Sequence, residues 1–289
     1  MSQGGAWFIV PVPKKTAQAV VDSVFPSGTV VLADVPTANT ALFPSGFDSN
    51  SHPVLVYGGY VADIRMASFE IDGDYVSGSL YVPHVRRPNS AAGTILSAPI
   101  SNYLSGVNGN TIAGLIPSLV STLVEGYSSR LGKFTPAAAA CQVNSNDVLS
   151  NNVAWWGLPN PISGPGIYPE AYDFQYLKKA SFTKYTERLL KTVLNQPEIL
   201  AGAYLLNNTC QRNQFYYNNA TSNMTPVSGN VTFGSAADGA TVQMSGVLQS
   251  AVGGRFYADN EGFTGCGRNV GFNPEDCDQA AKEVDQMAL

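Results

Sequence analysis

The residues of this chain that are best suited to chemistry lie in the segment 63–87, which reads DIRMASFEIDGDYVSGSLYVPHVRR. The segment has the pattern of two β-strands joined by Asp72-Gly73, a dipeptide typical of two-residue hairpin turns. Because side chains alternate between the two faces of a strand, this turn predicts which residues share a face. Four ionisable side chains then point the same way: Asp63, Arg65, His84 and Arg86.

The face that carries these charges also carries apolar residues such as Val61, Phe69 and Leu80. Burial of an unpaired charge is costly, so charges among apolar side chains are paired or line a wet cavity. We therefore predict a pocket with convergent charges, which is typical of small-molecule sites. The alternative is that the charged end of the hairpin leaves the core and enters solvent, and a three-residue turn would change the register.

Each charged residue has a chemical role in this hypothesis. His84 is suited to proton transfer as an acid, with Asp63 as a base, although a lone histidine is also common as a hydrogen-bonded structural residue. Arg65 and Arg86 would bind an anionic oxygen of a substrate or simply pair with Asp63. Six further residues are candidates for contact with the ligand: Tyr57, Phe69, Leu80, Tyr81, Trp155 and Trp156.

Trp155 and Trp156 stand side by side in the segment 151–172, which we expect to be a loop. Such a pair either packs a loop onto the body of the protein or closes a pocket over a hydrophobic ligand. The sequence leaves both interpretations open.

Composition and motifs argue against several classes of function. The chain has 289 residues, a net charge of −5 and only 13% charged residues, which disfavours nucleic acid as a partner. No apolar run approaches the roughly 20 residues of a membrane span. Histidine and carboxylate residues lack metal-site spacing, and no G-x-S-x-G, P-loop or G-x-G-x-x-G motif follows a predicted strand. We expect neither a metal nor a cofactor.

The segment 207–232 favours a secreted protein. It holds N-x-S/T sequons at Asn207, Asn219, Asn223 and Asn230, although a segment rich in Asn and Thr also makes such matches by chance. The N-terminus has no basic stretch followed by an apolar one, so no signal peptide is visible.

The cysteines support the same location. The four cysteines are Cys141, Cys210, Cys266 and Cys277. None of them has the C-x-x-C spacing of zinc or dithiol redox sites. Among the possible pairings we favour Cys266–Cys277, which closes a short loop, together with Cys141–Cys210. The alternative is that all of them are free thiols.

The periodicity of apolar residues predicts a mixture of strands and helices. Strands are expected at 6–13, 29–36, 53–71, 74–87 and 173–182, and again near 230–235, 240–250 and 254–263. Helices are expected at 16–26, 112–127 and 182–196, and from Pro274 to the C-terminus. No repeat or linker divides the chain, so we predict one α+β domain over residues 1–289, centred on an antiparallel, barrel-like sheet.

The order of these segments resembles the acetoacetate decarboxylase-like superfamily. FIVPVP, the helix TAQAVVDSVFP, and then YGGYVADIRM and YVSGSLYVPHVRR are similar to its N-terminal half. YDFQYLKKASFT, NNTCQRN, SGNVTFGSAADG and FNPEDCDQAAK are similar to its fungal branch, which tailors natural products. The resemblance spans most of the chain and implies a cone-shaped antiparallel β-barrel around a buried, mostly apolar cavity.

Decarboxylation in that superfamily resembles Schiff-base chemistry, in which one lysine attacks a keto group and an adjacent lysine depresses its pKa. The segment that would carry this pair, SAPISNYLSGVNGN (97–110), contains no lysine. Lys133 stands alone, and Lys178-Lys179 would point to opposite faces of a strand. A Schiff-base decarboxylase of a keto acid is therefore the alternative rather than the first expectation.

The fungal branch includes enzymes of tropolonic sesquiterpene biosynthesis that perform dehydration and hetero-Diels–Alder addition, and the resemblance implies a lyase or cyclase of that type. A cycloaddition needs no nucleophile, only apolar reactants held together and a hydrogen-bond donor on a carbonyl oxygen. Arg65, Arg86 or His84 would be that donor. The expected partner is a hydrophobic small molecule, which a non-catalytic carrier would bind equally well. A structural protein would have no cavity, and the oligomeric state, a homo-oligomer included, is left open.

Overall fold

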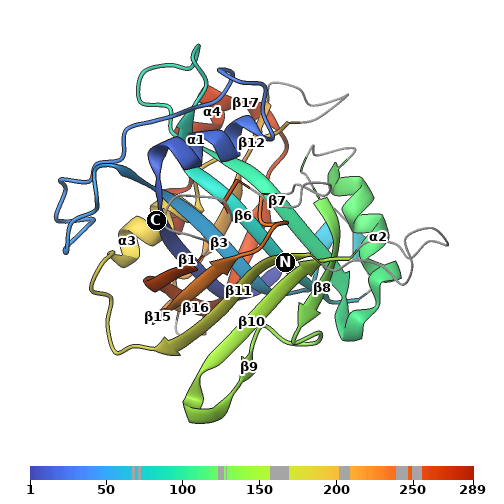
Figure 1. Ribbon diagram of the computed structural model, residues 1–289. Helices are drawn as coiled ribbons and strands as arrows, with labels where there is room; N and C mark the ends of the chain where they lie inside the picture. The colour runs from blue at the N-terminus through green and yellow to red at the C-terminus, as the bar shows by residue number, and fades with distance from the viewer. Residues whose placement is uncertain are drawn as a thin grey trace.

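The computed structural model describes residues 1–66, 69–70, 73–122, 127, 129–156, 169–201, 209–219, 221–238, 247–248 and 256–289. One large sheet dominates these residues (Figure 1). Its strands are β1 (Ser2–Pro13), β2 (Val31–Leu32), β3 (Ser51–Ala62), β6 (Tyr75–Arg86), β7 (Leu96–Gly106), β8 (Ser129–Thr135), β9 (Gln142–Val143), β10 (Leu149–Trp155), β11 (Glu170–Lys178), β12 (Glu198–Ile199), β13 (Thr209–Gln211), β14 (Asn213–Tyr216), β15 (Thr225–Phe233), β16 (Phe256–Gly271) and β17 (Glu275–Asp276). A separate pair consists of β4 (Arg65–Met66) and β5 (Phe69–Glu70), and the α-helices are α1 (Lys14–Asp22), α2 (Thr111–Val120), α3 (Glu187–Leu194) and α4 (Cys277–Lys282).

The large sheet closes in a ring. Its strands follow one another in the order β7-β8-β10-β11-β15-β16-β1-β3-β6, and β6 pairs again with β7. The α+β class expected from the sequence is confirmed. The sheet is mixed rather than antiparallel throughout, because β7 runs parallel to both β8 and β12, while the other pairings are antiparallel as expected.

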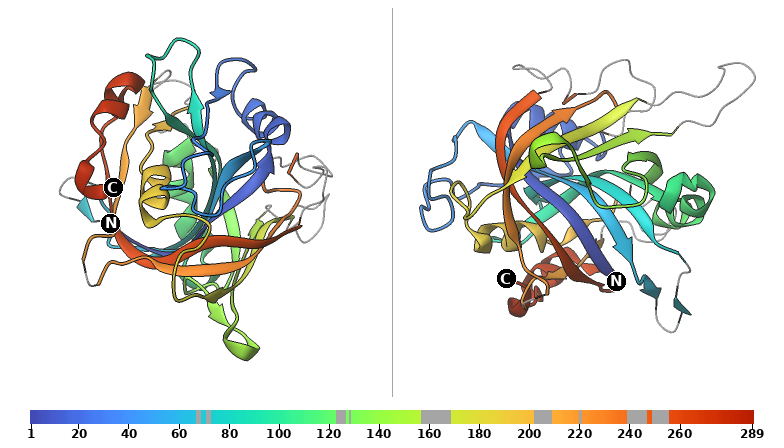
Figure 2. Two further views of the ribbon diagram at one scale, coloured as in Figure 1. Left: turned by 90° about the vertical axis from the view of Figure 1, so that its left-hand side faces the viewer. Right: turned by 90° about the horizontal axis from the view of Figure 1, so that it is seen from below.

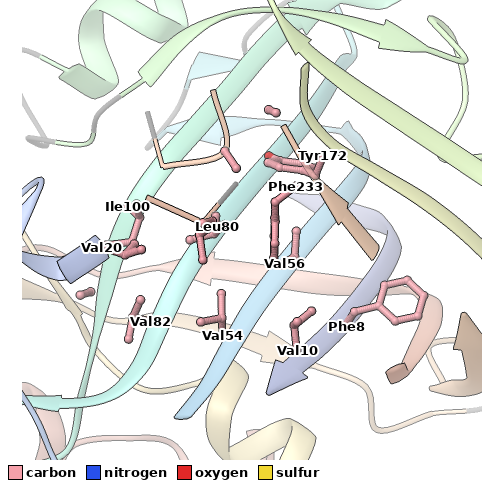
Figure 3. Packing of buried hydrophobic residues seen from close by; sticks show 14 of the residues in the cluster. Phe8, Val10, Val20, Val54, Val56, Leu80, Val82, Ile100, Tyr172 and Phe233 are labelled. Atoms are coloured by element: carbon pink, nitrogen blue, oxygen red, sulfur yellow. The ribbon is translucent and has the colours of Figure 1, made fainter. Parts of the chain in front are cut away.

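The inside of the ring is filled with apolar side chains (Figure 3). Phe8 of β1, Val56 of β3 and Leu80 of β6 belong to one buried cluster with Tyr172 of β11. Helix α1 adds Val20 to the same cluster. The interior is therefore a packed core over much of its length, as in small closed sheets whose lumen is filled by side chains.

Two glycines make this packing possible. Gly58 of β3 and Gly78 of β6 are opposite each other in the register. A Cβ at Gly58 would lie 2.9 Å from the ring of Phe174, and one at Gly78 would lie 2.7 Å from the hydroxyl oxygen of Tyr172. Both positions must lack a side chain so that aromatic residues of β11 can cross the interior.

A second apolar cluster covers the outer face of β1 and β3. Trp7 and Leu55 pack there with Leu189 and Val193 of α3, which lies against the curved sheet (Figure 2). Since both faces of β1 and β3 are buried, these strands read as continuous apolar runs rather than alternating ones. Within the part of the chain described above, no helix is long and apolar enough to cross a membrane.

The hairpin that carries the predicted charges has another register than expected. Val61 pairs with Tyr75, whereas Arg65 pairs with Glu70 in the short β4–β5 pair. The prediction that Asp72-Gly73 forms the turn and places Arg65 opposite Leu80 is therefore wrong. Met66 pairs with Phe69, so the chain reverses between these two residues rather than at Asp72-Gly73, and this earlier reversal moves the register of the long strands.

Other elements differ from prediction mainly in the middle of the chain. Strand β8 was not expected, and β7 lies in the segment 97–110, where only the family resemblance implied a strand. The segment expected as a loop from residue 151 begins with the strand residues of β10. Helix α4 begins at Cys277 rather than at Pro274, because the side chain of Asp276 caps it by accepting from the backbone N–H of Asp278 and of Gln279. The strand expected near 240–250 lies almost entirely outside the described residues.

The disulfide joins Cys210 of β13 to Cys277 of α4. The predicted pairings Cys266–Cys277 and Cys141–Cys210 are wrong, since Cys141 and Cys266 are free. The physical reason is the pairing of β13 with β17, which brings Cys210 beside the start of α4. A buried disulfide is compatible with an extracellular protein.

Removal of this disulfide is expected to destabilise the chain. The bonded cysteines are 67 residues apart in sequence, so the bond restricts a long loop in the unfolded state. We expect the double variant Cys210→Ser/Cys277→Ser to lose about 2–4 kcal/mol of unfolding free energy in urea denaturation. Cys266→Ser, at an exposed free cysteine, is the matched control, and equal midpoints for both variants would contradict the prediction.

Candidate functional site

The predicted charged face does not converge. Asp63 and Arg65 form an ion pair with each other, with 2.6 Å between Oδ1 and Nε, and their side chains are 48% and 63% exposed. Arg86 is exposed at the end of β6, and of the four residues only His84 is buried. For Asp63, Arg65 and Arg86 the alternative interpretation is therefore correct, because the charged end of the hairpin lies in solvent.

His84 occupies an interruption of the β6–β7 pairing, between Val82 and Val85, and has a φ of 52°. Its backbone N–H donates to Oε1 of Gln196 at 2.8 Å. Burial, and secondarily the neighbouring His52, lower the pKa of His84 to about 4. The imidazole is therefore neutral at neutral pH, which does not suit it to the predicted role of an acid.

The predicted ligand-contact residues divide between the two faces of the sheet. Leu80 belongs to the interior cluster, and Trp155 packs against that cluster. Tyr57 and Tyr81 lie on the outer face, where both rings contact Trp7, with ring centroids 4.3 and 6.4 Å away. Leu80 and Trp155 are thus the two that share the interior.

The two other residues predicted to contact a ligand are Trp156 and Phe69. Trp156 follows β10, and its backbone N–H donates to the carbonyl oxygen of Leu131 at 2.9 Å. Phe69 lies in β5, and its side chain is outside the described residues.

Polar side chains gather in one part of the ring interior, on strands that the sequence did not reveal. Arg130 of β8 is the register partner of Tyr103 in β7. Because side chains alternate along β8, Arg130 points to the same side as Phe134, a member of the interior cluster. The ring of Tyr103 makes an edge contact with that of Tyr172, with centroids 6.2 Å apart. We call Arg130, Tyr103 and Tyr172 the donor row.

The donor row contains buried donors that lack an acceptor. Nη1 of Arg130 and the hydroxyl of Tyr172 are buried and form no hydrogen bond of good geometry among the described residues, although the guanidinium of Arg130 lies close enough to the hydroxyl of Tyr103 to oppose the rise in its pKa. The hydroxyl of Tyr103 donates to the carbonyl oxygen of Ala236 at 2.6 Å. Burial raises the pKa of both Tyr103 and Tyr172, so both phenols keep their protons. A buried donor without an acceptor costs about 1–3 kcal/mol, so the row is suited to an oxygen atom supplied by a ligand.

A buried carboxylate and apolar walls complete the surroundings. Asp238 is buried, and its Oδ2 accepts a hydrogen bond from the backbone N–H of Val247. Its charge acts on the hydroxyl of Tyr103 and contributes to the raised pKa of that residue. Leu80 and Phe233 of the interior cluster provide the apolar surface. Donors on one side and hydrocarbon on the other are typical of small-molecule sites.

Lysine does not contribute to this interior. Every lysine of the chain lies among the described residues, and each is exposed or half-buried. Lys133 and Lys178 are exposed, while Nζ of Lys179 lies 3.2 Å from a carboxylate oxygen of Glu261. A Schiff-base enzyme holds its lysine inside the substrate pocket, and this arrangement does not offer one.

The sequons lie on the surface where they are described. Asn219 and Asn223 are exposed and Asn230 is half-buried, whereas Asn207 lies outside the described residues. Oδ1 of Asn219 accepts a hydrogen bond from the hydroxyl of Thr221, the third residue of its sequon, at 2.8 Å.

No protein-family model, curated protein or solved structure matches the chain. Its function is therefore argued from the residues of the donor row and their surroundings.

Proposed function

We propose that this chain is a lyase or cyclase that binds a hydrophobic small molecule at the donor row and catalyses dehydration and hetero-Diels–Alder addition. The observation that carries the proposal is the pair of buried donors without acceptors, Nη1 of Arg130 and the hydroxyl of Tyr172, beside an apolar interior. In this proposal they replace Arg65, Arg86 and His84 as the donors to the substrate.

The chemistry follows from what these groups can do. A carbonyl or tropolone oxygen that accepts from Arg130 and Tyr172 draws electron density from the conjugated system, which lowers the barrier to cycloaddition. In this proposal the reactants displace part of the packed interior beside Leu80 and Phe233, and positioning alone then supplies several kcal/mol. In the dehydration Asp238, the buried carboxylate beside the row, would take a proton from carbon and return it to the departing hydroxyl group, which leaves as water.

The fold and the location are part of the same proposal. We propose that the ring is a cone-shaped barrel of the acetoacetate decarboxylase-like type and that the protein is secreted and glycosylated. The surface position of Asn219 and Asn223 and the Cys210–Cys277 disulfide support secretion. The exposure of the lysines favours a reaction without a Schiff base over a keto-acid decarboxylase.

Substitution of the donors tests the proposal. With a hydroxylated tropolonic sesquiterpene precursor and an electron-rich olefin, Arg130→Gln is expected to lower kcat by about 10²–10³-fold, because it removes a charged donor to the developing negative oxygen. Tyr172→Phe is expected to lower it less. Product formation is measured by liquid chromatography and mass spectrometry.

The control is Arg268→Gln, which removes the same charge at a surface position where the guanidinium lies 5.3 Å from the ring centre of Tyr216. Unchanged turnover in Arg130→Gln would refute the site. Binding without turnover in the unmodified protein would identify a carrier. Borohydride trapping of a keto acid on any lysine would establish the decarboxylase instead.

A further inference from the structure

Cys141 is a free thiol at the edge of the ring interior. It directly precedes β9, and the hairpin of β9 and β10 projects from the ring at the lower edge of Figure 1. The residue is half-buried and packs against the interior cluster, whereas Ala138 and Ala139 before it are exposed. A small solute can therefore reach the sulfur from the side of this loop, while the other side of the residue faces the interior.

The hydroxyl of Tyr176 lies beside this sulfur. Burial is the main cause that raises the pKa of Tyr176, and the nearby thiol of Cys141 raises it further, so the phenol keeps its proton. Tyr176 is 2% exposed, and its hydroxyl forms no hydrogen bond of good geometry among the described residues. The hydroxyl of Thr264 also lies near, but it donates to the carbonyl oxygen of Gly5 at 2.9 Å. Since sulfur is a weak acceptor, this buried O–H favours an oxygen acceptor next to the sulfur.

Neighbouring residues hold the thiol and the phenol in place. Nδ2 of Asn151 donates to the carbonyl oxygen of Ala140 at 2.8 Å, which anchors the chain at the residue before the cysteine. Asn151 is the register partner of Phe174, so it lies on the same face of the sheet as Tyr176. The ring of Tyr176 makes an edge contact with that of Phe8, with centroids 5.4 Å apart. In such packed surroundings an acceptor for the phenol must be small.

An oxygen atom bonded to the sulfur of Cys141 meets these requirements. It requires room for a single atom, and its lone pairs accept from the hydroxyl of Tyr176. A mixed disulfide with a small thiol would instead bring a carbon chain and a second weakly accepting sulfur to the same place. A sulfenic acid, in which the sulfur carries one hydroxyl group, therefore fits this position better.

We propose that Cys141 is a modification site, at which a hydroperoxide converts the thiol into a sulfenic acid that a hydrogen bond from Tyr176 retains. The thiolate attacks one peroxide oxygen, so that an S–O bond forms and the O–O bond breaks. The sulfur loses two electrons to the peroxide. With hydrogen peroxide, the second oxygen takes the proton released by the thiol and leaves as water. This step uses no substrate of the reaction proposed for the donor row and does not depend on that reaction.

The other free cysteine, Cys266, provides an internal comparison, because it is exposed and falls in a different tryptic peptide. The intact protein is treated with hydrogen peroxide, catalase removes the excess, and dimedone added after increasing delays labels the sulfenic acid that remains. Mass spectrometry of the peptides measures the label on each cysteine. We expect the sulfenic acid of Cys141 to persist at least about tenfold longer than that of Cys266, since the bond from a buried donor holds its oxygen away from water and from other thiols.

Variants separate the hydrogen bond from simple shielding of the sulfur. Tyr176→Phe removes only the hydroxyl and is expected to shorten the lifetime at Cys141 about tenfold. Tyr257→Phe, which removes another buried hydroxyl that has no partner among the described residues, is the matched control and should leave the lifetime unchanged. The comparison of the two cysteines in the unmodified protein stands even if a variant fails to fold. No label on Cys141, an unchanged lifetime in Tyr176→Phe, or a disulfide between Cys141 and Cys266 in place of the label would each overturn the proposal.

Discussion

Replacement of Glu261 by Gln is expected to lower the free energy of unfolding by about 3–5 kcal/mol, as is typical when one partner of a buried ionic network is removed. Glu261 of β16 has 0% of its surface exposed. Its carboxylate accepts from the backbone N–H groups of Thr183, Lys184 and Tyr185, at distances from 2.7 to 3.0 Å. Nζ of Lys179 completes the arrangement at 3.2 Å.

The size of the effect follows from where these donors lie. The segment 183–185 leads into α3, whose Leu189 and Val193 pack into the outer apolar cluster. An amide at Glu261 would turn an NH₂ group toward backbone N–H donors and toward the ammonium of Lys179. Buried donors would then be left without acceptors, and the entry to α3 would lose its attachment to the sheet.

A neighbouring carboxylate is the matched control. Asp259 lies on the same strand and also bonds the segment before α3, through Nζ of Lys184 at 2.7 Å, but its side chain is 72% exposed. Asp259→Asn is therefore expected to cost less than about 1 kcal/mol. Urea denaturation followed by circular dichroism measures both variants, and a loss for Glu261→Gln as small as that for Asp259→Asn would show that Glu261 is not an anchor.

The strands and helices with strong apolar patterns could be predicted from the sequence. β1 and β3 are continuous apolar runs because both of their faces are buried, and α3 shows the helical spacing of Leu189, Leu190 and Val193. These patterns depend only on local burial. They can therefore be recognised in the sequence even when the neighbouring strands are unknown.

The strand that carries Tyr103 could not be predicted in this way. Its inward residues Leu96, Ala98 and Ile100 alternate, but Tyr103 follows three residues later. Leu80 of β6 pairs with Ser101 of β7, but the next residue, Tyr81, pairs with Pro99, so β7 has one extra residue between these pairs. This bulge breaks the two-residue period in β7, and the small polar residues around it read as a loop.

The wrong register and the wrong disulfide have a common cause. The face on which Arg65 lies depends on the inserted β4–β5 pair, and the partner of Cys277 depends on the pairing of β13 with β17. Both are contacts between strands rather than properties of one strand. Alternation within a single strand fixes its two faces but not its neighbour, and this is why the donor row, which joins β7, β8 and β11, was not visible.

Acidification from pH 7 to pH 5 is expected to lower the free energy of unfolding by about 4 kcal/mol through the two histidines, about 2 kcal/mol from each. Burial is the main cause that lowers the pKa of His52 from 6.5 to about 4, and burial followed by the nearby His52 does the same for His84. Nε2 of His52 bonds the carbonyl oxygen of Pro83 at 2.7 Å, which favours its protonated form only in part. Lys14, the other charged group that acts on His52, adds to the lowering.

The sign of the pH dependence follows from these directions. Below pH 6.5 the unfolded chain takes up protons on both histidines, whereas the folded chain does so only near pH 4. The unfolded state therefore binds more protons, and stability that is complete above about pH 6.5 is lost as the pH falls toward 4. Hydrogen bonds from Lys184 and Ser228 lower the pKa of Asp259, and hydrogen bonds from the segment 183–185 outweigh burial and lower that of Glu261, so neither carboxylate accounts for a loss between pH 7 and pH 5.

Two substitutions separate the histidines from the rest of the chain. His84→Asn keeps a residue type that tolerates the φ of 52°, and His52→Gln keeps a side-chain donor for Pro83. Each single variant is expected to halve the loss of unfolding free energy between pH 7 and pH 5, and the double variant to remove most of it, even if all three start from a lower stability at pH 7. Because the quantity compared is the change with pH within each variant, a structural cost that is independent of pH cancels. A loss in the double variant as large as in the unmodified protein would assign the acid sensitivity to other groups.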